Sequence, residues 1–262
     1  MTIRSPTTNA RLPELVLMPG MQKSGTSWVC NMLVDLVIGQ TGRDLRALRA
    51  ELGLLELLAP YYTPTFREKL TENRINRLLA ASNAIASPFV FKTHRPPTDA
   101  VWKLIDSGRA KATYIFRDPR DVLLSALNHG VRERAAGRWP IRGFARLTNI
   151  ERALRWFERR VYPVYREWSR KEEVLLVRYE DLVSSPVATM QRVAAHVGLN
   201  RDVGVITTIV ERYAAASVKT PEIRKALHLS DGPKGKKIES FSPDERAMLD
   251  QRLGPILGSM SY

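Results

Sequence analysis

The sequence predicts an α/β protein in which a central parallel sheet is flanked by helices, giving three layers. Short apolar segments that each lead toward a segment with helical periodicity are the main observation, at residues 15–18, 89–93, 112–116 and 174–177. Strands that are apolar throughout are typical of parallel sheets buried on both faces. Ligands of such sheets bind beyond the carboxyl ends of the strands, so we expect functional residues in the turns after these segments.

The remaining elements follow from periodicity and from residues that begin or end helices. Pro119 and Pro186 suit the first turn of a helix, and Gly198 suits its end. Ser242 predicts the N-cap of the last helix, with Pro243 at its first position. The periodic segments predict helices at residues 26–39, 43–58, 66–81, 99–107, 119 onward and 186–197, and a long amphipathic stretch at 143–169.

Composition indicates an ordinary globular protein. The 262 residues are 44% apolar and 26% charged, which fits one domain, expected at residues 12–262 after a loose polar arm at residues 1–11. The longest apolar run is too short to span a bilayer. Cys30 is the only cysteine, so no intramolecular disulfide forms. We therefore expect a soluble, cytoplasmic protein, with Cys30 buried on a helix; its oligomeric state stays open.

The formal net charge of +14 favours an anionic partner, which includes nucleic acids, acidic membranes and phosphorylated small molecules. Arginine is spread along the whole chain, whereas a basic nucleic-acid-binding tail is more concentrated. A nucleic-acid-binding protein therefore remains only as an alternative.

The turn after the first strand has the parts of a phosphate-binding loop. Small residues let backbone N–H groups converge on an anion, and the N-terminus of the next helix adds partial positive charge. Gly20 and Gly25 have the separation found in ATP-hydrolysing P-loops, but Thr26 takes the position of their lysine and Lys23 lies inside the loop. The fold is therefore expected to be P-loop-like, with one phosphate at this point and no metal, which disfavours the alternative of a nucleotide or small-molecule kinase.

The segment from Lys23 to Trp28 resembles the 5′-phosphosulfate-binding loop of the cytosolic-type sulfotransferases, usually P-K-S-G-T-T-W; Gln22 and Ser27 depart from that form. These enzymes use 3′-phosphoadenosine 5′-phosphosulfate (PAPS). The resemblance implies that Lys23 contacts the 5′-phosphate and the bridging oxygen, and that Trp28 stacks on adenine. The donor-binding residues that it implies in this loop are Lys23, Ser24, Gly25, Thr26, Ser27 and Trp28.

His94 follows the strand at 89–93, where the hydroxyl of an acceptor could lie. A histidine titrates near neutral pH and suits a general base. Lys92-Thr93-His94 resembles the family's K-T-H, which implies that His94 takes the acceptor's proton while Lys92 and Lys23 stabilise charge. His129, His196 and His228 are interpreted as packing or surface residues.

Two further segments resemble the family in the same order along the chain. Arg117 follows the third predicted strand, and Ser125 lies eight positions later, the spacing of the family's 3′-phosphate motif. An arginine suits this task because its planar guanidinium binds phosphate through two N–H groups. Tyr179 belongs to an R-Y-E-D-L element whose tyrosine approaches adenine. Glu180 and Asp181 are interpreted as structural, because no histidine or cysteine ligands accompany them.

The last segment departs most from the family. Gly232 and Lys234, with Phe241, keep the spacing of its R-K-G-x-x-G segment, which also holds the 3′-phosphate, but Ser230 and Asp231 replace the arginine and lysine. Substitutes for those two cations would be Lys234, Lys236, Lys237 or Arg224. A protein that keeps the donor-binding fold without turnover is therefore a further alternative.

The resemblance implies a sulfotransferase that moves a sulfuryl group from PAPS, as co-substrate, to a hydroxyl or amine of a small or lipidic acceptor. No nucleic acid, stable membrane insertion or metal is expected. Apolar acceptor contacts are expected from residues 52–58 with Tyr61 and Tyr62, and from a second group comprising Trp139, Phe144, Trp156 and Phe157. Both groups have an equally good interpretation as helix core.

Overall fold

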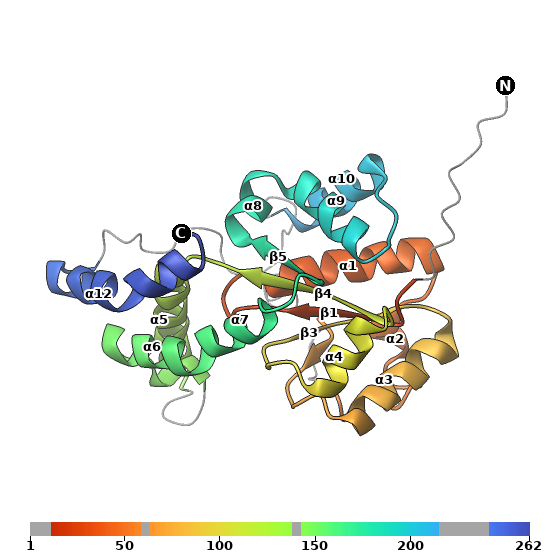
Figure 1. Ribbon diagram of the computed structural model, residues 1–262, viewed down its shortest axis with the longest axis horizontal. Coiled ribbons are helices and arrows are strands. Elements are labelled where there is room, and N and C mark those ends of the chain that lie inside the picture. Colours follow the sequence, from red (N-terminus) through yellow and green to blue (C-terminus); the bar gives the residue numbers. More distant parts are fainter. Residues whose placement is uncertain (1–11, 59–62, 138–142, 215–240) are drawn as a thin grey trace.

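A computed structural model of the chain describes residues 12–58, 63–137, 143–214 and 241–262. Within these ranges, a five-stranded parallel sheet forms the centre of the molecule (Figure 1). The strand order is β2-β3-β1-β4-β5. The strands are β1 (Leu15–Pro19), β2 (Thr65–Phe66), β3 (Phe89–Thr93), β4 (Ala110–Phe116) and β5 (Val174–Arg178). The α/β fold predicted from the sequence is confirmed.

Successive side chains of a strand point to opposite faces of the sheet, so they pack into two separate cores. Leu15 and Leu17 of β1 pack on one face of the sheet, and Val16 and Met18 pack on the other. Both sets are almost fully buried, because helices cover both faces. This two-sided burial explains why the strands are mostly apolar, with exceptions such as Lys92 and Thr93 near the carboxyl end of β3.

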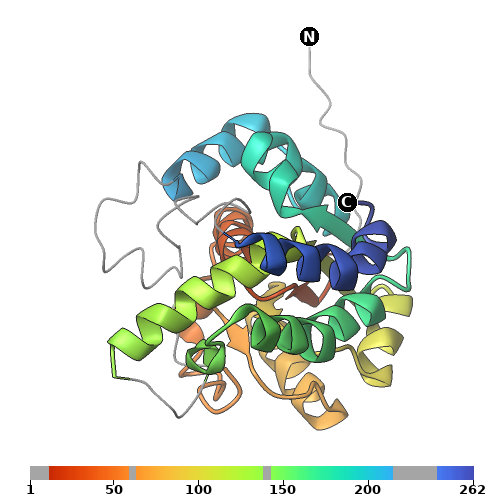
Figure 2. The same cartoon turned by 90° about the vertical axis from the view of Figure 1, so that its left-hand side faces the viewer.

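Helices form a layer on each face of the sheet and a third group at one end (Figure 1). One face carries α1 (Thr26–Thr41), α8 (Tyr179–Ser184), α9 (Pro186–His196) and α10 (Val203–Tyr213). The other carries α3 (Glu72–Ile85), α4 (Asp99–Asp106) and α7 (Tyr162–Trp168). Figure 2 faces the group at the end, which comprises α5 (Pro119–Ala135), α6 (Ile150–Trp156) and α12 (Pro243–Ser259). No helix of the described residues is long and apolar enough to cross a membrane.

Two predicted helices between β1 and β3 are wrong in their extent. The stretch 43–58 forms only α2 (Leu45–Leu48) and then a series of turns, in which Gly53 takes a left-handed φ of 65° that ends helical continuation. The stretch 66–81 begins as strand β2, and its helix starts only at Glu72. Phe66 pairs with Thr93, and its ring packs 5.9 Å from that of Phe91. A two-residue strand is too short to produce a detectable alternation.

The amphipathic stretch 143–169 is divided into four pieces. A 3₁₀ turn, η1 (Gly143–Arg146), precedes α6, and a π-helical turn, η2 (Phe157–Val161), joins α6 to α7. Pro163 explains the π turn, because its ring lacks an N–H and would collide with the carbonyl four residues earlier in a regular α-helix. The wider turn relieves that collision, and the Tyr162 N–H donates to the Phe157 carbonyl.

The predicted helix starts are confirmed at two proline-containing ends. Asp118 caps α5 by accepting from the Arg120 N–H, and Pro119 is the first residue of that helix. Ser242 and Glu245 form a capping box at the start of α12, with Pro243 at its first position. These caps position α5 and α12 next to the carboxyl end of β4.

A buried carboxylate connects α1 to α2 and α10. Asp35 is 8% exposed, and its two oxygens accept from Arg46 at 2.6 Å, Arg212 at 2.9 Å and the Tyr213 hydroxyl at 2.9 Å. Removal of this carboxylate leaves the largely buried Arg46 guanidinium without that ion pair.

We expect Asp35→Ala to lower the free energy of unfolding by about 3 kcal/mol, because the largely buried Arg46 guanidinium loses its 2.6 Å ion pair and keeps the longer one with Asp44 at 3.3 Å. Urea denaturation of wild type and variant measures this. Asp106→Ala is the control: it removes an exposed ion pair with Lys171 and should cost less than about 1 kcal/mol. Equal losses in the two variants would contradict the role of Asp35.

Candidate functional site

The carboxyl ends of β1, β3, β4 and β5 bring four predicted segments to one edge of the sheet. The loop after β1 contains Lys23, and His94 follows β3 directly. Arg117 follows β4, and Tyr179 begins α8 after β5. Residues that are more than 150 positions apart in sequence therefore form one site. The structure thus places these four segments at the edge that the strand pattern predicts.

Two glycines determine the shape of the loop after β1. A Cβ atom on Gly20 would lie 2.4 Å from the Thr26 hydroxyl oxygen and 2.9 Å from the Ile115 carbonyl oxygen. Gly25 has a φ of 76°, and a Cβ there would lie 2.9 Å from the Tyr179 ring. Lys23 also takes a left-handed φ of 72°. The loop is thus held tightly between β4 and α8, where only glycine fits at two positions.

The hydroxyls of this loop have different partners. The Ser24 hydroxyl is buried and donates to the Met21 carbonyl at 2.6 Å, and the Thr26 hydroxyl donates to the same carbonyl at 3.3 Å. Both therefore stabilise the loop itself. The Ser27 hydroxyl accepts from Lys92 Nζ at 2.5 Å, so its own proton remains available for an anion.

Lys23 points toward α5, where its Nζ lies 3.1 Å from His129 Nδ1. The Phe144 ring centroid lies 5.7 Å from the same Nζ. Burial, together with the positive charges of Arg132, Lys92 and Arg117, lowers the pKa of Lys23 to about 8. An anion in the loop would offset these repulsions, so the surroundings of Lys23 favour a negatively charged ligand.

Lys92 is a second buried cation at the same edge. Its side chain extends from β3 to Ser27, it is 7% exposed, and burial lowers its pKa to about 8. Cys30 lies near it on α1; burial raises the pKa of this thiol to about 12, so it stays protonated and acts as a small apolar side chain.

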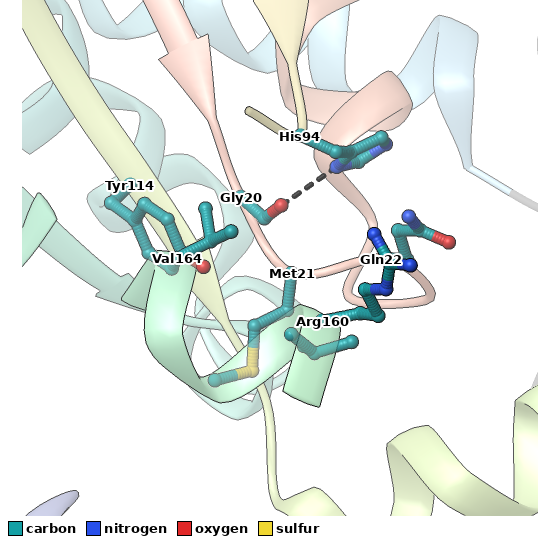
Figure 3. A pocket seen from close by; sticks show the side chains of 8 residues that line it. Gly20, Met21, Gln22, His94, Tyr114, Arg160 and Val164 are labelled. Carbon is teal, nitrogen blue, oxygen red and sulfur yellow. Dashed lines mark hydrogen bonds between the residues drawn. The ribbon is translucent and has the colours of Figure 1, made fainter. Parts of the chain in front are cut away.

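His94 has a defined orientation. Its Nδ1 lies 2.7 Å from the Gly20 carbonyl oxygen, as the dashed line in Figure 3 shows. A carbonyl only accepts, so Nδ1 carries a proton and the neutral ring has its lone pair on Nε2. A small pocket adjoins the ring, lined by Gly20, Met21, Gln22, His94, Tyr114, Arg160, Val161 and Val164 (Figure 3).

Arg117 and Tyr179 lie against each other. The guanidinium carbon is 4.4 Å from the Tyr179 ring centroid, and two guanidinium nitrogens donate to one Asp121 oxygen at 2.7 and 3.2 Å. Ser125 lies two turns into α5 and is half-buried. Asp121 is one helical turn before it, so an anion bound by Arg117 would compete with an existing ion pair.

Trp28 is half-buried at the start of α1 and packs partly against the core of that face. Its indole nitrogen is buried and has no hydrogen-bond partner among the described residues. Gly232 and Lys234, with Ser230, Asp231, Arg224 and the other lysines of that segment, lie outside the described residues, as do Tyr61, Tyr62 and Trp139. Within the described part of the chain, no group of three or more His, Cys, Asp or Glu residues could hold a metal ion.

Sequence reasoning missed three side chains of this edge. His129, interpreted as a packing or surface residue, contacts Lys23 and has its ring centroid 4.8 Å from that of Phe144. Tyr114 and Arg160 line the pocket beside His94. The one signal in the sequence is for His129, which lies one helical turn after Ser125 and therefore on the same face of α5.

Comparison with known proteins identifies a family. The profile of the sulfotransferase domain matches residues 13–251. Sulfotransferase 1B1 of the dog (Canis lupus familiaris) is 25% identical over 227 residues, which cover 83% of this chain and 70% of that protein. Cytosolic sulfotransferase 14 of Arabidopsis thaliana is 23% identical over 228 residues, covering 83% of this chain and 65% of that protein.

Solved structures share the fold at low sequence identity. Retinol dehydratase in complex with androsterone and the inactive cofactor PAP has a TM-score of 0.55 and 20% identity, covering 94% of this chain and 81% of the other. A mouse sulfotransferase complexed with PAP has a TM-score of 0.56 and 15% identity, and the match covers 93% of this chain and 84% of the other. The sheet and its flanking helices are therefore those of known sulfotransferase structures.

The lowered pKa of Lys92 predicts how stability depends on pH. The folded state releases this proton near pH 8 and the unfolded state near the ordinary lysine pKa of 10.5, so the unfolded state binds more protons between these values. Stability conferred through Lys92 therefore rises with pH across that window. The free energy of unfolding of wild type, minus that of Lys92→Met, should therefore increase by on the order of 2 kcal/mol between about pH 7 and about pH 9.5.

Denaturant titrations at several pH values measure this difference. Lys103→Met, which removes an exposed lysine of α4, is the matched control and should show no comparable change relative to wild type. A constant difference between wild type and Lys92→Met across the window would contradict the burial of a charged Lys92.

Proposed function

The chain belongs to the sulfotransferase domain family and is a sulfotransferase that uses PAPS; we propose that its acceptor is a small molecule bearing a hydroxyl or amine, and that Lys23, Lys92 and His94 act on the reacting groups. The observation that carries this proposal is the position of His94, whose ring is held by the Gly20 carbonyl of the loop that contains Lys23. One backbone segment thus positions both a candidate base and a candidate phosphate site.

The residues present fit a nucleotide that carries several negative charges. At neutral pH Lys23 and Lys92 are mainly protonated, because their pKa values of about 8 lie above that pH. Two more cations, Arg117 and Arg132, lie close enough to this edge to lower the pKa of Lys23. PAPS, when bound, supplies the sulfuryl group and a leaving phosphate. A loop of small residues followed by a helix N-terminus suits its 5′-phosphate.

We assign the two lysines to charge that develops at the reacting sulfur. Lys23 Nζ exchanges its contact with His129 for the bridging oxygen and the 5′-phosphate, and the backbone N–H groups of the loop bind the same phosphate. Lys92 holds Ser27 and adds positive charge from β3. Preorganised donors of this kind in a site shielded from water favour the transition state over the ground state.

His94 takes the proton of the acceptor. Because Nδ1 donates to Gly20, the lone pair of the neutral ring lies on Nε2. As Nε2 takes the hydroxyl proton, the acceptor oxygen forms a bond to sulfur and the bond between sulfur and the bridging oxygen breaks. The bridging oxygen keeps that electron pair, which gives a sulfate ester and 3′-phosphoadenosine 5′-phosphate (PAP). The imidazolium then releases its proton to solvent.

The far end of the nucleotide is assigned to a second set of side chains. Arg117 and Ser125 bind the 3′-phosphate, while Trp28 and Tyr179 contact the adenine. The ring of Tyr179 is 4.4 Å from the Arg117 guanidinium, so the two groups act together. Gly232 and Lys234 complete the 3′-phosphate site in this proposal. The structure describes neither residue, and their assignment is supported only by the sequence spacing.

We also place the enzyme in the cytoplasm. The curated relative from Arabidopsis thaliana is named a cytosolic sulfotransferase, and the proposed reaction needs neither a disulfide nor a membrane. The bound ligands named for the neighbouring structure, androsterone and PAP, support a small-molecule acceptor beside the nucleotide.

A transfer assay with sulfur-labelled PAPS and a panel of phenols, alcohols and amines tests the function directly. Labelled product and an equal amount of PAP are expected, with the rate unchanged by EDTA because the proposed site uses lysines rather than a metal. Loss of transfer on EDTA addition, with recovery by Mg²⁺, would favour phosphoryl-type chemistry instead.

His94→Ala should lower turnover by at least about 100-fold, because general-base catalysis is typically worth that factor. Its affinity for PAP, measured by titration calorimetry, should stay within a few-fold of wild type. His196→Gln is the control, since His196 hydrogen-bonds the Ala112 carbonyl under α9, away from the site. Full turnover in His94→Ala would show that another group is the base.

Arg117→Ala should weaken PAP binding by about 10- to 100-fold, as expected for loss of a charge-assisted contact to phosphate. Turnover at saturating donor should change much less, because the 3′-phosphate does not react. Arg120→Ala is the matched control: Arg120 lies three positions away and pairs with Asp118. Unchanged PAP affinity in Arg117→Ala would remove Arg117 from the donor site.

A further inference from the structure

The pocket beside His94 contains a cation that the proposed donor site does not use. Arg160 lies on the π turn η2, and its side chain extends toward His94 and Gln22 (Figure 3). Val161 and Val164 line the pocket from the same segment. Because the pocket adjoins the candidate base, a group bound in it lies close to the acceptor's reacting atom.

The π turn explains why an arginine reaches this position. Pro163 widens the turn before α7, which changes the rotational position of the residues that follow Phe157 relative to a continuous α-helix. Glu158 of the same turn pairs with Arg252 of α12. The turn therefore directs its acid toward α12 and Arg160 toward the pocket.

Arg160 has no opposing carboxylate in the pocket. No Asp or Glu is among the lining residues, and no ion pair of Arg160 exists within the described parts of the chain. Among the described residues of this segment, Arg155 pairs with Glu151 at 2.8 Å, whereas Arg159 of the same turn also has no ion pair. A guanidinium beside a general base therefore offers its N–H groups to a ligand.

Tyr114 adds a second unused polar group. Its ring lines the pocket from β4, and it is fully buried. Its hydroxyl has no hydrogen-bond partner among the described residues. Burial raises the pKa of this phenol, so the hydroxyl stays protonated and can donate. An unpartnered buried hydroxyl is uncommon in folded proteins and is costly unless a ligand accepts from it.

We propose that the pocket binds an oxyanion of the acceptor itself, with Arg160 pairing with the anionic group and Tyr114 donating a hydrogen bond to the same molecule. This inference rests on the proposed function, since it assigns the anionic group of the acceptor to the pocket beside His94, which Gly20, Met21 and Gln22 also line. The substrate class is therefore a hydroxylated molecule that carries a carboxylate, or another oxyanion, near the hydroxyl that receives the sulfuryl group.

A matched series of acceptors tests this class. The probes are para-hydroxybenzoate, para-hydroxyphenylacetate and para-hydroxyphenylpropanoate, each compared with its uncharged amide, under saturating PAPS. At least one carboxylate should exceed its amide in kcat/KM by about 10-fold or more, the factor expected for one charge-assisted pair. Phosphorylated and sulfated phenols of the same lengths distinguish a carboxylate from other oxyanions.

Variants separate a direct contact from the general positive charge of the protein. Arg160→Gln should lower kcat/KM for the preferred carboxylate by about 10-fold or more and leave its amide within about 3-fold. Arg159→Gln, with the same change in charge on the same turn but no place in the pocket lining, should change neither. Tyr114→Phe should weaken acceptor binding without altering PAP affinity, and Arg160→Lys should restore part of the preference.

The outcomes distinguish this inference from the function on which it rests. Equal efficiency with carboxylates and amides, or equal effects of Arg160→Gln and Arg159→Gln, would overturn the acceptor assignment while sulfuryl transfer stands. Absence of PAP binding and of transfer to every phenol would instead overturn the proposed function. Calorimetric binding of the same acceptors to the PAP-loaded protein gives a second readout that does not depend on turnover.

Discussion

The close contact at Gly20 is the constraint on which the site depends. Its Cα lies so near Thr26 and Ile115 that no side chain fits, and the Met21 N–H donates to the Ile115 carbonyl at 2.9 Å. The loop is thereby held against β4, and the Gly20 carbonyl is directed at His94. A displacement of this backbone would move the candidate phosphate site and the candidate base together, which is why loop geometry and proton transfer are linked in this protein.

Charge is the second organising feature. Lys23 and Lys92 lie at one edge of the sheet with pKa values lowered by burial, and Arg117 and Arg132 add to the repulsion at Lys23. Among the described residues, Glu133 is the only carboxylate that shifts the pKa of Lys23. Such an arrangement is unfavourable without a ligand, and an anion relieves it. Arg160 adds positive charge at the pocket beside His94, and no carboxylate lines that pocket.

The sequence predicted the elements whose signals are local. The strands with apolar runs, the capped helices and the four turns at the strand ends follow from patterns a few residues long, so Lys23, His94, Arg117 and Tyr179 were brought to one edge correctly. Features that depend on tertiary contacts were missed. Strand β2 depends on its pairing with β3, where Phe66 also packs on Phe91, and the turns around Gly53 replace a helix that periodicity favoured. Arg160 reaches the pocket from the π turn η2, which precedes Pro163 and which periodicity does not predict.

The most direct test of the whole account is a crystal structure of the protein grown with PAP and without a divalent metal. The account predicts the 5′-phosphate within the loop, contacted by Lys23 Nζ in place of His129, and the 3′-phosphate beside Arg117 and Ser125. His94 should keep its bond to the Gly20 carbonyl. A nucleotide bound elsewhere, or a loop that admits ATP with Mg²⁺ but not PAP, would contradict it.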